Sequence, residues 1–164
     1  MTVDRTDVHV RMKFAKTFLS HKFKGNGLKY EVGVCIRTGE IVWIHGPKRC
    51  GMNDIQVARD AFISFLNDDE MANADNGYRG AFKHLKTPCL YHYLSWEEMG
   101  MAGIARARHE TVNGRLNFFA VLTKPFRHDL GKHSACFRAV AVITQLILKN
   151  GSPVFQVEYH DEGV

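Results

Sequence analysis

The sequence has no long hydrophobic run, no closely spaced cysteine pair and no internal repeat. Its most apolar stretch, residues 139–148, is too short to span a membrane and contains Thr144 and Gln145. The first ten residues lack the apolar core of a signal peptide. None of the four cysteines belongs to a C-x-x-C motif, which argues against a disulfide framework or a zinc knuckle and favours a reducing, intracellular compartment. We therefore expect one domain over residues 1–164, with no membrane partner.

Acidic residues are outnumbered, with 22 lysines and arginines against 17 aspartates and glutamates, and the net charge is +5. This balance is compatible with nucleic-acid binding, although many basic proteins bind none. The basic residues also lie in clusters, each of which could equally be ordinary solvated surface. The clusters are Lys16, Lys22, Lys24 and Lys29; Lys48 and Arg49; Arg106, Arg108 and Arg115; and Lys124, Arg127 and Lys132.

The hydrophobic pattern predicts strands first and helices later. Alternation predicts a strand over 7–14, and two runs rich in strand formers predict a hairpin over 28–36 and 41–46. Apolar residues at helical spacing predict helices over 53–67, about 101–120 and 134–148, the first capped by Asn53 or Asp54. A short strand over 70–75 and an extended segment over 153–159 complete the prediction, which is a mixed α/β fold.

Three carboxylates stand at positions that are not plainly charged surface. Asp4 lies at or near the first strand, Asp75 precedes an Asn-Gly turn, and Glu110 lies on the second helix among arginines. Locally, Asp75 favours a turn and Glu110 a surface salt bridge. Metal-dependent cleavage of phosphodiesters, however, needs two or three carboxylates that converge from different elements.

The blocks around these carboxylates resemble, in order, the nuclease domain of DDE-type transposases, and more narrowly the Harbinger-type branch of DDE superfamily endonucleases. The blocks are "SHKFKGNGLKYEVGVCIRTGEIVWIHGP", "NDIQVARDAF", "ADNGY", "ARARHETVNGRLNFF" and "FRHDLGKHSACFRAVAVITQLIL". The resemblance implies an RNase H-like mixed sheet flanked by helices, N-terminally truncated relative to complete transposases. It also implies three ligands of Mg²⁺ or Mn²⁺. These are Asp4, Asp75 of the D-x-G-Y motif, and Glu110 of the R-x-x-x-E motif. Asp54 matches a further family aspartate, and a helix cap explains that residue equally well.

The resemblance also implies DNA as the partner and a nuclear location, and it is compatible with a separate DNA-recognition protein. The DNA backbone would be contacted by Lys22, Lys24, Arg106, Arg108 and Arg115. Two positions depart from the family pattern: Arg5 follows Asp4 where the family commonly has glycine, and Asn117 stands where it tends to have lysine. A catalytically inactive, transposase-derived module that binds DNA or protein therefore remains the alternative.

Other candidate sites have weaker patterns. His128 and His133 lie close together, but no cysteine stands at zinc-finger spacing, so capping or phosphate contact is favoured over zinc. His109 could assist proton transfer beside Glu110, while a surface imidazole is the simpler interpretation. An RNA-binding protein is disfavoured because no aromatic RNP-like strand motif occurs.

Overall fold

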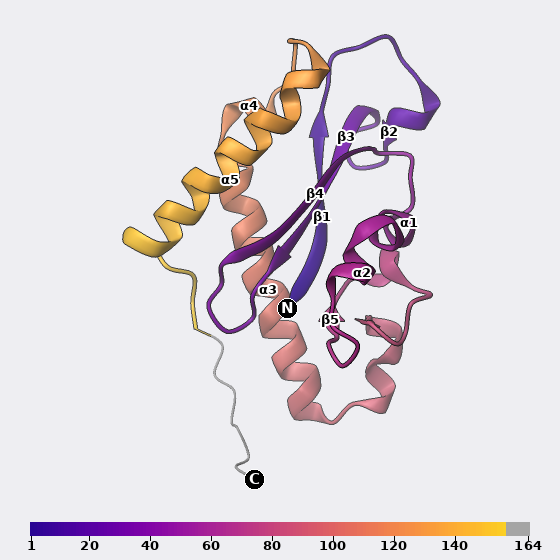
Figure 1. Cartoon of the computed structure of the whole chain (residues 1–164), viewed down its shortest axis with the longest axis vertical. Helices are drawn as coiled ribbons and strands as arrows, with labels where there is room; N and C mark the ends of the chain where they lie inside the picture. Colours follow the sequence, from indigo (N-terminus) through magenta and orange to yellow (C-terminus); the bar gives the residue numbers. More distant parts are fainter. Residues whose placement is uncertain (157–164) are drawn as a thin grey trace.

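The computed structural model describes residues 1–156 and consists of a six-stranded mixed sheet with helices on both faces (Figure 1). β1 lies in the middle, antiparallel to β3 and parallel to β5. β3 pairs antiparallel with β4 and, near its start, with β2, while β5 pairs parallel with β6. The strands are β1 Thr2–His9, β2 Leu19–Ser20, β3 Gly25–Val34, β4 Ile41–Arg49, β5 Ala72–Asn73 and β6 Leu85–Lys86.

One helical segment packs on one side of the sheet and three helices pack on the other (Figure 1). The first consists of α1 Asp54–Val57, a π-helical turn Ala58–Phe62 and α2 Ile63–Phe65. The others are α3 Trp96–Leu116, α4 Ala120–Thr123 and α5 His133–Asn150. Short 3₁₀ turns occupy Lys16–Phe18, Asn76–Tyr78, Pro88–Tyr93 and Leu130–Lys132.

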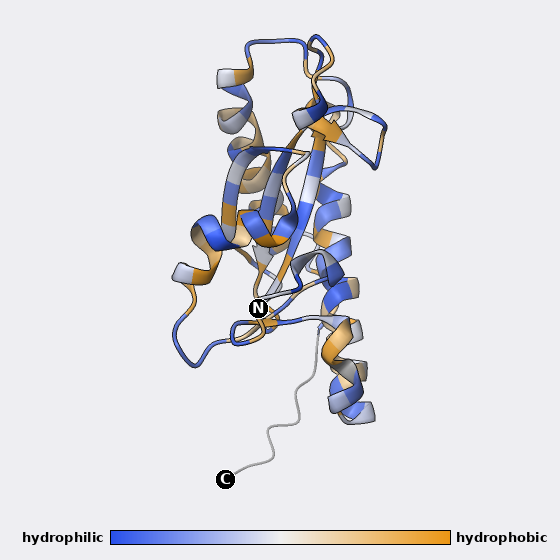
Figure 2. Ribbon diagram, turned by 90° about the vertical axis from the view of Figure 1, so that its right-hand side faces the viewer, coloured by the Kyte–Doolittle hydropathy of each residue, from blue (hydrophilic) through white to orange (hydrophobic). Residues whose placement is uncertain are grey.

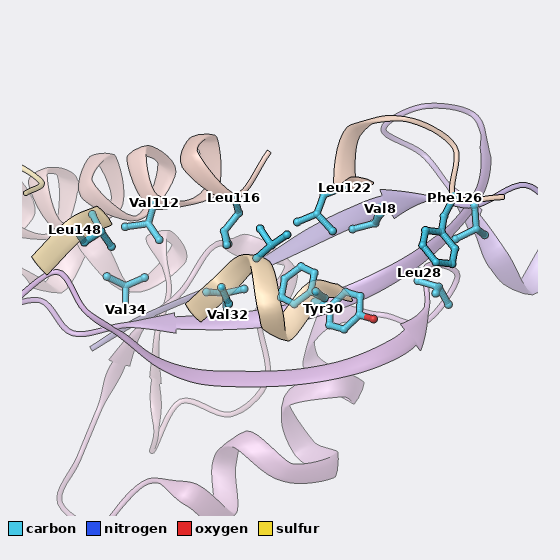
Figure 3. Packing of buried hydrophobic residues seen from close by; sticks show 14 of the residues in the cluster. Val8, Leu28, Tyr30, Val32, Val34, Val112, Leu116, Leu122, Phe126 and Leu148 are labelled. Carbon is cyan, nitrogen blue, oxygen red and sulfur yellow. The ribbon is translucent and has the colours of Figure 1, made fainter. Parts of the chain in front are cut away.

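The two faces of the sheet support two hydrophobic cores. On one face, Tyr30 and Val32 of β3 pack in one cluster with Leu116 of α3 (Figure 3). The Tyr30 ring also stacks on Phe137 of α5. On the other, Val3, Phe62 and Tyr78 belong to the smaller core. Along the central strands and the helices that cover them, hydrophobic and hydrophilic residues are intermixed (Figure 2). Because both of its faces are covered, β3 is buried almost throughout, including Lys29 and Glu31.

The structure confirms the mixed α/β prediction, the hairpin and the three helices, and it corrects two boundaries. The first strand runs over Thr2–His9 rather than 7–14, because β1 pairs with β3 from Thr2 to His9 and leaves the sheet afterwards. The second helix begins at Trp96, earlier than expected. Residues 153–156 form no strand, and the remainder of the predicted extended segment lies outside the described residues. Over residues 1–156, none of the helices has both the length and the apolar character that crossing a membrane requires.

Candidate active site

A cavity of about 290 Å³ opens where β1, the segment after β5 and α3 meet. Its lining includes Asp4, Asp75 and Glu110, each contributed by a different element. β1 and β5 are adjacent parallel strands, and α3 packs against both, so residues far apart in the sequence face one space. The structure therefore brings together the three carboxylates that the sequence singled out.

Asp4 is the most constrained of the three. Its Oδ1 accepts a hydrogen bond from the backbone N–H of Arg5 at 2.7 Å, and its Oδ2 accepts one from Asn113 Nδ2 at 3.3 Å. Burial, and after it the negative charges of Asp75, Glu110 and Asp54, raise the pKa of Asp4 to about 7, against the opposing effect of the Arg5 hydrogen bond. The cavity thus concentrates negative charge around a half-buried carboxyl group.

Asp75 makes the turn and faces the cavity at the same time. Its Oδ1 accepts a hydrogen bond from the Gly77 N–H at 2.7 Å and so begins the 3₁₀ turn Asn76–Tyr78, which confirms the turn interpretation. A Cβ at position 77 would clash with Asp54 Oδ2 and lie 3.0 Å from Asp75 Oδ1. Glycine is therefore the residue that lets the turn pass between these two carboxylates.

Glu110 is an exposed residue of α3, and buried polar contacts fix this helix against β1. Thr6 Oγ1 donates to Asn113 Oδ1 at 2.9 Å, and Thr2 Oγ1 lies 2.7 Å from His109 Nδ1. His109 is only 2% exposed, so its interpretation as a surface imidazole is wrong. Burial lowers the pKa of His109 to about 4, which makes it a neutral hydrogen-bonding residue near pH 7.

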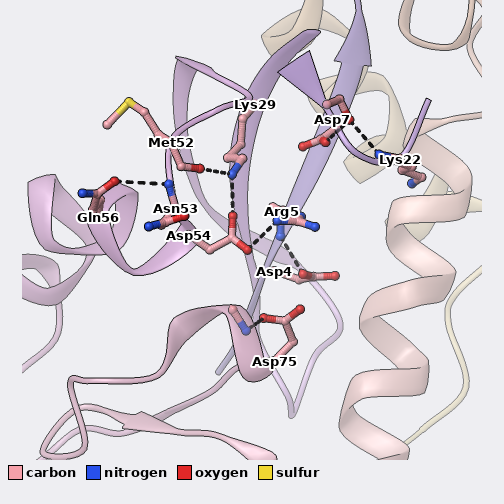
Figure 4. A network of polar contacts seen from close by, with 12 residues as sticks. Asp4, Arg5, Asp7, Lys22, Lys29, Met52, Asn53, Asp54, Gln56 and Asp75 are labelled. Atoms are coloured by element: carbon pink, nitrogen blue, oxygen red, sulfur yellow. Dashed lines mark hydrogen bonds and ion pairs between the residues drawn. The ribbon is translucent and has the colours of Figure 1, made fainter. Parts of the chain in front are cut away.

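Asp54 lies in an ion-pair cluster on the other side of β1 (Figure 4). Lys29 Nζ lies 2.6 Å from its Oδ1, and Arg5 Nη1 lies 2.7 Å from its Oδ2. Because both oxygens are engaged with cations, Asp54 is not placed to act as a ligand in the cavity. Nor is it the helix cap, since Asn53 occupies that position and Asp54 is the first residue of α1. Arg5 is thus turned toward Asp54, although it follows Asp4 directly.

The cations predicted to contact DNA divide into two groups. Lys22 and Lys24 are exposed, and Arg106 lines the carboxylate cavity. Arg108 is only 1% exposed and donates to the carbonyls of Ile36 and Phe155, so its predicted contact with DNA is corrected to a structural role. Arg115 likewise donates to the carbonyls of Ser152 and Pro153. Both arginines hold the segment that follows α5.

The donor set fits a hard divalent cation, because carboxylate oxygens are the ligands that Mg²⁺ and Mn²⁺ prefer. The residue types suit such an ion and face one cavity, but their oxygens are not arranged as a coordination shell. Among residues 1–156, no three Asp, Glu, His or Cys side chains are already gathered as a metal-binding group. Binding would require the Asp4, Asp75 and Glu110 side chains to turn toward one another within the cavity that they share.

Sequence reasoning missed Asn113, which donates to Asp4 in this site, and the buried Lys29, which pairs with Asp54 beside it. Asn113 lies three positions after Glu110, so helical spacing puts both on neighbouring parts of one face. That spacing could have indicated that Asn113 lies near the carboxylate site. Lys29 offered no such signal, since a lysine in a strand is ordinarily exposed.

Comparisons of the chain with protein-family models, with curated proteins and with solved structures give no match. The candidate site therefore rests on its own geometry, namely three carboxylates from three elements around one cavity.

Proposed function

We propose that this chain is a metal-dependent DNA endonuclease domain of the DDE transposase type, with an RNase H-like fold. The observation that carries the proposal is the convergence of Asp4, Asp75 and Glu110 on one cavity. A nuclear location and a separate DNA-recognition protein, both implied by the family resemblance, belong to the same proposal.

The topology of the sheet supports the fold assignment. β4, β3 and β1 form an antiparallel unit, and β5 and β6 extend it as strands parallel to β1. Asp4 lies on the central strand, Asp75 follows the adjacent strand, and Glu110 lies on a helix that packs across both. This arrangement supports the proposal, because the family resemblance leads us to expect acidic residues on these three elements.

Asp4, Asp75 and Glu110 would hold Mg²⁺ or Mn²⁺. When bound, two such ions would activate a water or a DNA 3′-hydroxyl for in-line attack and stabilise the leaving oxygen. The chain's other residues orient the carboxylates: the Arg5 N–H and Asn113 hold Asp4, the Gly77 N–H holds Asp75, and Arg106 adds positive charge to the lining. No side chain is required as a covalent nucleophile.

The DNA backbone would follow α3 away from the cavity. Asn117 lies two helical turns after Glu110, about 10 Å along the axis. Asn117 and Lys22 line a neighbouring cavity of about 270 Å³. Lys22 therefore supplies a cation near the helix position where the family tends to have lysine.

Plasmid nicking in Mn²⁺ or Mg²⁺ tests the proposal, with Mn²⁺ binding measured in parallel by electron paramagnetic resonance. We expect the wild type to nick DNA and each of Asp4→Asn, Asp75→Asn and Glu110→Gln to lower the rate at least about a hundredfold, with weakened Mn²⁺ binding. Asp69→Asn is the matched control, because Asp69 is exposed and lies outside the cavity.

Equal nicking by all of these proteins would exclude Asp4, Asp75 and Glu110 as the catalytic residues. The alternative function, a catalytically inactive DNA-binding module, is favoured by the absence of an assembled metal group among the described residues. It would be supported if DNA binds while neither nicking nor Mn²⁺ binding is detected.

A further inference from the structure

An apolar groove of about 820 Å³ lies between the C-terminal part of α3, the start of α4 and α5. Its apolar lining includes Phe118, Phe119, Ile143 and Ile147. None of its lining residues belongs to the carboxylate cavity, so the groove is a separate feature of the molecule.

The groove continues onto an uncovered apolar face of α5. One side of this helix is buried in the core through Phe137, Val140 and Leu148. The opposite side carries a second apolar stripe at helical spacing: Val142, Ile143, Leu146 and Ile147 are 60%, 45%, 54% and 43% exposed. Phe118, at the other edge of the groove, is 89% exposed. An apolar stripe on a helix normally packs against another part of the protein or a partner.

The charged residues that the structure places beside this surface are mostly basic. Arg115 lines the groove, and Arg138 and Lys149 lie on α5 before and after the apolar stripe, while Glu110 of α3 directly precedes the lining residue Thr111. α5 itself has no acidic residue, and Arg138 is exposed one helical turn before Val142. Lys149, near the end of α5, pairs with Glu40 in the turn between β3 and β4. An occupant with negative charges would therefore be attracted to this side of the molecule.

We propose that this groove binds an amphipathic helix of a partner protein, with apolar residues on one face and acidic residues along its flanks. The concave apolar floor fits the apolar face of a helix, which is a common mode of peptide recognition. The basic surroundings select for acidic flanks and oppose a second copy of this basic chain, which would bring like charges together. This proposal does not depend on nuclease activity.

Fluorescence anisotropy with labelled synthetic helices and the full chain tests the proposal. The probes are three 18-residue peptides with Leu, Phe or Met on one helical face and Glu elsewhere, each matched by a peptide with Lys in place of Glu. We expect at least one acidic peptide to bind and its lysine counterpart to bind at least about tenfold more weakly.

Two variants locate the binding surface. Ile143→Gln removes apolar surface and Arg138→Glu reverses a nearby charge, and each should weaken binding of the acidic peptide about tenfold. Val42→Gln is the matched control, because Val42 is 41% exposed on β4 and lies outside the groove. All three residues are exposed, so circular-dichroism melting curves should stay close to the wild type.

Several results would overturn the proposal. These are failure of all three acidic peptides to bind, equal binding of the lysine peptides, or binding unchanged by both Ile143→Gln and Arg138→Glu. Light scattering that shows a dimer dissociated by Ile143→Gln would assign the groove to a second copy instead. Sedimentation with phosphatidylserine vesicles that is lost in Ile143→Gln would assign it to a membrane surface.

Discussion

At the scale of single residues, the most informative feature is the set of polar side chains buried on β3. Lys29 is neutralised by Asp54, and it also donates to the Met52 carbonyl. Glu31 is fully buried, and its Oε2 accepts a hydrogen bond from Trp43 Nε1 at 3.0 Å. Among the described residues Glu31 takes part in no ion pair, whereas Lys29 is paired with Asp54.

Glu31 should make the folded state less stable as the pH rises. Burial raises its pKa from 4.5 to about 7, and the negative charges of Asp54 and Asp60 add to this, while hydrogen bonds from Trp43 and Tyr78 oppose it. An unfolded glutamate ionises near 4.5, so between pH 4.5 and 7 the folded state holds the extra proton. The free energy of unfolding therefore falls across this window, by about 3 kcal/mol for a shift of this size, and stays lowered above it.

Glu31→Gln removes this titration. The glutamine side chain stays neutral, so the free energy of unfolding of the variant should not fall with Glu31 ionisation. Its difference from the wild type should therefore grow by about 3 kcal/mol between roughly pH 4 and pH 8. Urea unfolding at a series of pH values measures the difference, with Glu97→Gln at an exposed position as the control. A difference between Glu31→Gln and wild type that stays constant across this range would contradict the assignment.

At the scale of elements, α3 shows what the sequence could and could not predict. Its existence follows from helical spacing, but its start was missed although Ser95 and Glu98 form a capping box just before and within it. Its buried side was also obscured, because that side includes polar residues such as Arg108, His109 and Asn113. Each has a hydrogen-bonding partner in a distant part of the chain, and a single sequence does not show such partners.

The same reasoning applies to β1. Apolar and polar residues alternate over 7–14, whereas Asp4 is not a typical strand residue, so the sequence predicts the strand further along the chain. Pairing with β3 over the whole length of β1 overrides that preference. Asp4, Asp75 and Glu110 nevertheless line one cavity, a long-range arrangement that local sequence patterns do not indicate.

Asn113 should couple the position of α3 to the candidate metal ligands. Asn113→Ala leaves the Thr6 hydroxyl without its acceptor and Asp4 without one of its donors, which should lower the free energy of unfolding by about 1–3 kcal/mol. If Asp4 acts as proposed, Mn²⁺ affinity and nicking rate should also fall, each by about tenfold.

Thr111→Ala is the control for Asn113→Ala, since Thr111 lies on the same helix and its hydroxyl bonds only to the Ala107 carbonyl one turn earlier. Measurements at a temperature where both variants are folded separate stability from metal binding. Loss of stability in Asn113→Ala with unchanged Mn²⁺ affinity would reduce Asn113 to a purely structural residue.

At the scale of the whole molecule, the lysines and arginines have different structural roles, and only some of them lie where a ligand could contact them. Arg108 and Arg115 bond to backbone carbonyls around the end of the described chain, and Arg5 and Lys29 neutralise Asp54. Arg106 and Lys22 lie at cavities along one side of α3. The basic clusters of the sequence therefore do not form one binding surface, and a count of cations overstates the number available to DNA.

DNA binding should separate these groups of cations. If DNA binds as proposed, Arg106→Ala and Lys22→Ala should each weaken binding and reduce the slope of log affinity against log salt by about 1, because each removes about one phosphate contact. Arg108→Ala should leave that slope unchanged and instead lower the free energy of unfolding by about 2–3 kcal/mol, since the buried Arg108 side chain and its hydrogen bonds to the Ile36 and Phe155 carbonyls are lost. Anisotropy titrations of a labelled duplex in EDTA at several salt concentrations, together with urea unfolding, measure both quantities. A reduced salt slope in Arg108→Ala with unchanged stability would instead place Arg108 on the DNA.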